Sequence, residues 1–190
     1  MKRIWVTGFR QFELGIFGEN DPKLKVIRYA LAKQLRRAID EDADWLITGG
    51  QSGIEQWAIQ EALSLREDNP QFQTALMTPF ADFGAQWKPE RQTQLADLKT
   101  KVDFSAAVSQ LPYQNPSQLK NYQQFMLDHT EEAYIFFDEQ ADQSPVRYAW
   151  QAAKRYQEGH SYEVHQIDFD RLQEYAEEYG EKLSEAGHYD

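Results

Sequence analysis

The sequence predicts an α/β fold with one doubly wound, mostly parallel sheet and helices on both of its faces. Short apolar stretches alternate with amphipathic helical stretches along the whole chain, and this alternation is typical of parallel strands joined by helical crossovers. Two of the apolar stretches end in glycine, at Thr7-Gly8 and at Thr48-Gly49-Gly50. The 190 residues, 41% of them hydrophobic, are enough for one sizeable core. We therefore expect a single Rossmann-like domain over residues 1–185 and a frayed tail over residues 186–190.

The amino-terminal part predicts two strand–helix pairs. Residues 2–7 form a short apolar run that stops at a glycine, which indicates a strand. Asp21-Pro22 then provides an N-cap and a first helical residue, and the apolar residues keep helical spacing to about residue 40. Residues 44–48 predict the second strand, and the apolar stripe of residues 54–65 predicts the second helix.

The middle of the chain predicts two further strand–helix pairs. Residues 72–78 form an apolar strand that a proline ends, and residues 90–101 can form a helix. Residues 104–109 predict a strand, and a loop punctuated by two prolines follows it. The apolar residues between positions 119 and 126 then mark another helix.

The carboxyl-terminal part completes the alternation. The continuous apolar run of residues 133–137 is typical of a strand that is buried on both faces. Ser144-Pro145 begins a helix to about residue 158, with Ser144 as a plausible N-cap. Residues 162–167 predict the last strand, and residues 169–183 a final amphipathic helix.

The composition excludes several classes of function. A net charge of −11 and a pI near 4.8 argue against generic duplex-DNA binding, which needs clustered Lys and Arg. Basic residues outnumber acidic ones over residues 1–40, however, which leaves room for an anionic ligand. There is no cysteine, so there is no disulfide or thiol chemistry. The apolar run Ile4–Val6 is too short for a signal peptide or a membrane span, so we expect a cytoplasmic location.

Familiar cofactor and metal motifs are absent. The chain has neither the G-x-G-x-x-G dinucleotide fingerprint nor the P-loop pattern G-x-x-x-x-G-K-[ST]. It also has no G-x-S-x-G nucleophile elbow. The four histidines show no metal-ligand spacing with one another, so we expect no metal.

Four loops are expected to meet at one edge of the sheet. Ligands of doubly wound sheets bind at the carboxyl ends of the strands, where the strand order reverses. The loops that should collect there are residues 8–20, 49–53, 79–89 and 138–144. The most unusual residues of the chain lie in these loops, which predicts a nucleotide-type pocket.

The turn over residues 49–53 is the strongest candidate for a ligand site. A glycine-rich turn that leads into a helix start can bind an anion. We expect the ligand to be a phosphate or ribose held by Gly49, Gly50, Gln51 and Gly53. Glu55 would accept hydrogen bonds from sugar hydroxyls, or could itself act catalytically. Ser52 and Glu55 also have the spacing of a capping box, so Glu55 could instead hold the helix start.

Further candidates lie in the other three loops. In the first, Thr7 and Gly8 would line the site, and Arg10 is suited to a phosphate or a carboxylate. Trp87, in the loop that Pro79 begins, could stack a base, whereas the other four tryptophans are expected in the core. After the strand that ends at residue 137, candidates are Asp138, as a ribose ligand or base, and Arg147.

A set of short motifs spreads over residues 1 to about 175. The motifs are Thr7-Gly8, Phe12-Glu13-Leu14-Gly15, Gly50-Gln51-Ser52-Gly53-Ile54-Glu55 with Trp57, Thr78-Pro79-Phe80, Trp87, Pro112-Tyr113 and Ser144-Pro145. Together they resemble the YpsA-like proteins of Gram-positive bacteria, a branch of the SMF/DprA–LOG (SLOG) superfamily. The resemblance implies a Rossmann-like domain that binds a nucleotide-derived ligand or nucleic acid, with residues 49–53, Glu55 and Thr7-Gly8 at the site. It also implies a role linked to cell division or stress.

The glycine turn departs from two better-defined branches of that superfamily. LOG-type phosphoribohydrolases carry P-G-G-x-G-T-x-x-E, whereas this turn lacks the leading proline and Glu55 stands two residues after Gly53. DprA-type proteins, which bind single-stranded DNA, carry S-G-x-A-x-G-I-D, and here Glu55 replaces the aspartate. The net charge of −11 further disfavours nucleic acid.

These observations favour a cytoplasmic protein that binds a nucleotide or a nucleotide sugar such as an ADP-ribose-like compound, as a sensor. One alternative is a LOG-type hydrolase of N-glycosidic bonds, and another is single-stranded DNA binding of the DprA type. A scaffold that acts through residues 9–17 is a fourth hypothesis. The sequence leaves open the ligand's identity, catalysis and self-association into homo-oligomers.

Overall fold

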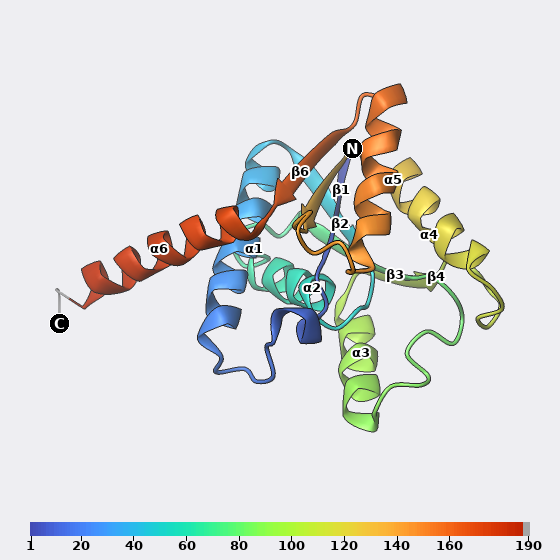
Figure 1. Cartoon of the computed structure of the whole chain (residues 1–190), viewed down its shortest axis with the longest axis horizontal. Helices are drawn as coiled ribbons and strands as arrows, with labels where there is room; N and C mark the ends of the chain where they lie inside the picture. Colours follow the sequence, from blue (N-terminus) through green and yellow to red (C-terminus); the bar gives the residue numbers. More distant parts are fainter. Residues whose placement is uncertain (188–190) are drawn as a thin grey trace.

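Six parallel strands form one sheet in the order β4-β3-β2-β1-β5-β6 in the computed structural model, which describes residues 1–187 (Figure 1). The strands are β1 (Lys2–Gly8), β2 (Ala43–Thr48), β3 (Gln73–Thr78), β4 (Phe104–Ala107), β5 (Glu132–Phe136) and β6 (Glu163–Ile167). β1 is central, and its Trp5 pairs with Ile47 on one side and Ala133 on the other. The predicted parallel sheet is confirmed, with each strand within a few residues of its expected bounds.

Helices connect the strands and cover both faces of the sheet. They are α1 (Pro22–Asp40), α2 (Ile54–Ser64), α3 (Pro89–Lys101), α4 (Ser117–Asp128), α5 (Val146–Gly159) and α6 (Phe169–Ala186). α1 packs against α2 and α2 against α3, while α4 packs mainly against α5 rather than against the strands. The connections from β1 to β4 run along the sheet in one direction, and those from β4 through β5 to β6 run in the other. Because such connections are right-handed, the group α1, α2 and α3 and the group α4 and α5 lie on opposite faces of the sheet (Figure 1).

The sequence correctly places the start of α1, whereas the predicted N-cap Ser144 is wrong, because the N-cap residue of α5 is Pro145. Asp21 accepts a hydrogen bond from the Lys23 amide at 2.9 Å, so it caps α1 as predicted. All five residues of β5 are buried, as the continuous apolar run indicated. The loop after β1 is more ordered than expected, because a short 3₁₀ helix spans Gln11–Leu14.

The carboxyl-terminal helix α6 is longer than the sequence indicated. Its Tyr175 and Tyr179 pack against Tyr29 of α1, and the helix extends past α1 to Ala186 (Figure 1). Of the predicted frayed tail, residues 188–190 lie outside the described residues. No helix within residues 1–187 is both long and apolar enough to cross a membrane.

Candidate functional site

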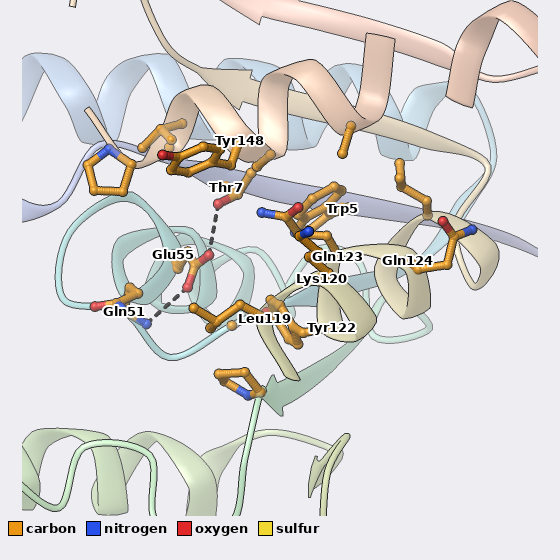
Figure 2. Close-up of a pocket in the computed structure, with 18 of the residues that line it drawn as sticks. Trp5, Thr7, Gln51, Glu55, Leu119, Lys120, Tyr122, Gln123, Gln124 and Tyr148 are labelled. Atoms are coloured by element: carbon orange, nitrogen blue, oxygen red, sulfur yellow. Dashed lines mark hydrogen bonds between the residues drawn. The ribbon is translucent and has the colours of Figure 1, made fainter. Parts of the chain in front are cut away.

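A cavity of about 1120 Å³ lies at the point where the strand order reverses, between β1 and β5. Its floor is the carboxyl-terminal part of β1, and its walls come from the glycine turn after β2 and from α4 and α5 (Figure 2). This is the edge at which ligands of doubly wound sheets bind. This volume is slightly above the roughly 300–1,000 Å³ typical of small-molecule sites.

The loops that follow β1 and β2 are joined by their backbones. Arg10 and Gly53 form an isolated antiparallel bridge, in which the Gln11 amide donates to the Ser52 carbonyl at 3.0 Å. Gly53 has a φ of +128°, and a Cβ there would lie 2.6 Å from the Gln11 nitrogen. Glycine is therefore required at this position by the contact between the two loops. Gly53 does not line the cavity.

Glu55 occupies the first turn of α2 and points back into the glycine turn. Its Oε1 accepts from the Gln51 amide at 3.0 Å, and its Oε2 accepts from the Thr7 hydroxyl at 2.8 Å (Figure 2). The side chain lines the cavity although only 7% of the residue is exposed. Burial raises the pKa of Glu55, and these two hydrogen bonds and the charge of Arg10 oppose that shift only in part.

The predicted capping box between Ser52 and Glu55 is wrong. The N-cap residue of α2 is Gly53, and no side chain of the described residues caps it. The Ser52 hydroxyl is turned away from the helix, because it donates to Gln11 Oε1 at 3.0 Å and accepts from Arg91 at 2.9 Å. Glu55 reaches Gln51, one residue before Ser52, so its carboxylate closes the turn instead of the helix start.

This closure changes the chemistry expected at the turn. The amide groups that could bind a phosphate are partly used, since Gln51 donates to Glu55 and the Ile54 amide donates to the Phe9 carbonyl at 3.1 Å. A carboxylate also stands where an anion would bind, and like charges at this distance repel. The turn therefore favours a neutral, hydroxyl-bearing group next to Glu55 over a phosphate.

Gly49 keeps a small space open between Glu55 and α4. A Cβ at this position would collide with Glu55 Oε1 and with the Tyr122 hydroxyl. Tyr122 is buried and lines the cavity, and its hydroxyl has no hydrogen-bond partner in the described part of the chain. Burial and the nearby Glu55 charge raise the pKa of Tyr122, so the hydroxyl remains a potential donor.

The charge around the cavity is mostly positive, although the protein carries −11 overall. Arg10, Lys120 and Arg155 line the cavity, and within residues 1–187 none of them forms an ion pair. α4 and α5 both begin at this edge of the sheet, and helix amino termini carry partial positive charge. Among the lining residues that the structure describes, Glu55 is the single carboxylate.

The structure brings together most, but not all, of the residues expected at the site. The lining includes Thr7, Gly8, Arg10, Gly49, Gly50, Gln51, Glu55 and Pro79. The cavity is not lined by the other five candidates, which are Ser52, Gly53, Trp87, Asp138 and Arg147.

Trp87, Asp138 and Arg147 each have other contacts. The Trp87 ring lies edge-on to Phe83, with 5.2 Å between ring centroids. Asp138 accepts from the Phe169 amide at 3.0 Å and thereby joins β5 to the start of α6. Arg147 donates to the Asp142 carbonyl at 2.9 Å and stacks on Tyr148.

Sequence reasoning missed one floor residue and two walls of the cavity. Trp5, which was expected to be core, is indeed buried but also lines the cavity. The α4 wall includes Leu119, Lys120, Gln123, Gln124 and Leu127, and the α5 wall includes Tyr148, Ala149, Ala152, Arg155 and Tyr156. Both sets recur at three- and four-residue spacing, which in a sequence alone is the pattern of a core-facing helix.

One further cluster could hold a metal ion by geometry. Ligand atoms of Glu132, Glu163 and His165 lie within 4.8 Å of one another at the opposite edge of the sheet. Lys2 Nζ lies 3.1 Å from Glu132, however, and supplies the positive charge that a metal would bring. The contacts present are therefore those of an ion-pair network.

The fold and the cavity define an α/β protein of Rossmann type with a ligand-sized site at its topological switch point. Comparison with known proteins narrows this class. The family model YpsA, described as the YspA SLOG family, matches residues 4–172. The chain therefore belongs to the YpsA family of SLOG proteins.

Relatives in lactic acid bacteria match along their whole length, and each carries the name UPF0398 protein. The relative from Latilactobacillus sakei is 49% identical over 186 residues, which is 98% of this chain and 100% of the relative. The one from Limosilactobacillus reuteri (strain DSM 20016) is 48% identical over 187 residues, covering 97% and 98% of the two chains. The one from Levilactobacillus brevis is 45% identical over 190 residues and covers both chains fully.

Proposed function

We propose that the protein binds a ribose-bearing nucleotide or nucleotide sugar, with the ribose hydroxyls on Glu55. The observation that carries the proposal is the position of the Glu55 carboxylate, which is buried, lines a large cavity and has no cationic hydrogen-bond partner within residues 1–187. An acidic side chain near the carboxyl ends of the strands is a common ribose ligand in sheets of this kind.

The hydrogen-bonding capacity of Glu55 supports this choice of ligand. A carboxylate offers about four acceptor positions, and the protein uses one on each oxygen, through Thr7 and Gln51. The remaining positions suit a vicinal diol, whose two hydroxyls can each donate one hydrogen bond. Gly49 supports the proposal as well, because any side chain there would fill the space beside Oε1.

The surroundings of Glu55 suit the remainder of a nucleotide. Arg10 and the amino termini of α4 and α5 make the mouth of the cavity favourable for a phosphate group. Phe80, Tyr113 and Tyr148 provide aromatic surface that could stack a base. Such a ligand would be encountered in the cytoplasm, where we place the protein.

Isothermal titration with AMP and with 2′,3′-dideoxy-AMP tests the proposal. Each hydrogen bond to a charged group contributes about 1.5–3 kcal/mol, so removing both hydroxyls, and with them two such bonds, should weaken binding by about 100-fold or more. Glu55→Gln should weaken the binding of AMP by a similar factor and leave the affinity for 2′,3′-dideoxy-AMP unchanged. Glu90→Gln is the matched control, because Glu90 is an exposed residue in the first turn of α3 and does not line the cavity. Equal affinity for both nucleotides, or none for either, would overturn the assignment.

A second candidate function is hydrolysis of an N-glycosidic bond. The raised pKa of Glu55 favours it, because a general acid or base works best with a pKa near the working pH. Chromatography of a nucleotide panel after incubation would detect the released base. Release that disappears in Glu55→Gln would make the protein an enzyme, whereas intact nucleotides throughout would leave binding as the function.

A further inference from the structure

The cavity continues well beyond Glu55. On its floor it runs backward along β1 from Thr7 to Trp5, a distance of about 6–7 Å for two strand residues. On the α5 wall it extends from Val146 to Tyr156, which is about 15 Å of helix. We call the part beyond Thr7 the outer arm, and define it by Trp5, Lys120, Gln123, Gln124, Arg155 and Tyr156. Figure 2 shows the first four of these residues.

The floor of the outer arm carries an unused hydrogen-bond donor. Trp5 is 1% exposed, and its indole Nε1–H has no hydrogen-bond partner among the residues that the structure describes. An indole nitrogen can only donate, so an acceptor is needed to satisfy it. Buried donors without partners are rare in native structures, so this indole points to an acceptor that a ligand would supply.

The walls of the outer arm are cationic and polar. Lys120 rises from α4 and Arg155 from α5, and neither is paired within residues 1–187. No carboxylate of the described residues lines the arm. Asp128, at the end of α4, accepts from Gln124 Nε2 at 2.9 Å and lies outside the lining. A group that satisfies both the indole N–H and the two cations must be an anionic acceptor.

We propose that the outer arm is a second binding subsite that takes a phosphate or pyrophosphate group. Trp5 would donate to one of its oxygens from the floor, and Lys120 and Arg155 would flank it from the two helices. If a ribose also lies on Glu55, which rests on the function proposed above, the ligand is a two-part compound of the dinucleotide class. A mononucleotide would fill only the part of the cavity around Glu55.

Thermal unfolding with inorganic pyrophosphate at millimolar concentration tests the subsite by itself, because a ligand of the folded state raises the melting temperature. We expect an upward shift in the wild-type protein. Exposed charged groups contribute weakly one by one, so the double variant Lys120→Gln/Arg155→Gln should lower the affinity about tenfold. Lys154→Gln is the matched control, since Lys154 neighbours Arg155 on α5 but lies over the Trp150 ring outside the cavity.

A second variant tests the floor of the arm. Trp5→Phe keeps an aromatic ring and removes the N–H, so pyrophosphate should bind about tenfold more weakly. Trp45→Phe, on β2 and outside the cavity, controls for loss of an indole from the sheet. The inference is overturned if pyrophosphate produces no shift, or if its affinity is the same in the wild-type protein and in the double variant.

Titration with ADP-ribose separates this inference from the proposed function. If the double variant and Glu55→Gln each bind ADP-ribose more weakly than the wild-type protein, both the outer arm and the ribose site are supported. Weakening by the double variant alone supports the outer arm and contradicts the ribose site, whereas weakening by Glu55→Gln alone does the reverse.

Discussion

Two buried glutamates lie at opposite edges of the same sheet, and their surroundings differ in kind. Glu132, at the start of β5, is 2% exposed and lies 3.1 Å from both Lys2 Nζ and His165 Nε2. Glu55, beyond the carboxyl end of β2, is 7% exposed and is held by a hydroxyl and an amide.

The two carboxyl groups are shifted in opposite directions. Burial favours the neutral form of both, but at Glu132 the hydrogen bonds from His165 and Lys2 outweigh burial and lower the pKa. At Glu55 burial dominates and raises the pKa. A buried acid with charged partners has its function inside the fold, whereas one that lacks them and borders a cavity is available to a ligand.

The strongest test of this contrast is removal of each charge. Glu132→Gln should lower the free energy of unfolding by about 3 kcal/mol, the lower end for a broken buried ion pair because Lys2 is partly exposed. Glu55→Gln should change it by less than about 1 kcal/mol, since burial already penalises the charged form. Urea unfolding at neutral pH measures both. Losses of equal size would remove the distinction between the two sites.

A second test concerns the contact between the loops after β1 and β2, which we expect to stabilise the region around Glu55 more than its carboxylate does. Gly53→Ala should destabilise the protein by about 1–3 kcal/mol, because the new Cβ meets the backbone of the neighbouring loop at a positive φ. Gly180→Ala in α6 is the control, since a Cβ there meets nothing within 4 Å among the described residues. It should stabilise by about 0.5–1 kcal/mol, as expected for a helix interior. Thermal unfolding that shows no difference between the two variants would contradict the loop–loop contact as the cause.

The pH dependence of stability sharpens the contrast further. Because the pKa of Glu132 is lowered, its contribution is present above the ordinary value of 4.5 and is lost as the pH falls below it. Because the pKa of Glu55 is raised, the folded state binds its proton more tightly, and stability falls as the pH rises above 4.5. The contribution of each glutamate is the difference in free energy of unfolding between the wild-type protein and its glutamine variant, measured on both sides of pH 4.5. Plotted against pH, this difference should have slopes of opposite sign for Glu132 and Glu55. Slopes of the same sign would refute the assignment.

The smallest expected effect concerns the tyrosine beside each glutamate. The Tyr134 hydroxyl donates to Glu132 at 3.3 Å, so Tyr134→Phe should cost about 1 kcal/mol. The Tyr122 hydroxyl is buried without a partner within residues 1–187, so Tyr122→Phe should be neutral or slightly stabilising in the free protein. Chemical unfolding of the two variants compares them directly, and a clear loss in Tyr122→Phe would mean that its hydroxyl is satisfied.

Most of the fold could be predicted because local signals and hydrophobic periodicity agree. Asp21-Pro22 marks the start of α1, and the unbroken apolar run at residues 133–137 marks a central strand. The end of α6 was predicted at residue 183 but lies at Ala186, because the last turns of an exposed helix have no apolar stripe to mark them.

The candidate site could be predicted only where it lies on loops. Glycines next to strands identified the turn that holds Glu55, since glycine at the end of a strand marks a turn or a close approach of the backbone. Trp5 could not be identified as a cavity residue from the sequence. A strand residue that faces the core and one that faces a cavity occupy the same positions in the alternation of apolar and polar residues. The aromatic loop around Trp87 suggested a ligand contact, but Trp87 lies against Phe83.

Helix α4 forms one wall of the cavity and yet packs mainly against α5. Its amide hydrogens should therefore exchange with deuterium through local opening, at a lower free energy than those of β1, which lies at the centre of the sheet. A ligand that touches both β1 and α4 would couple the helix to the sheet and slow that exchange. Deuterium uptake by α4 thus reports occupancy of the cavity, whichever compound fills it.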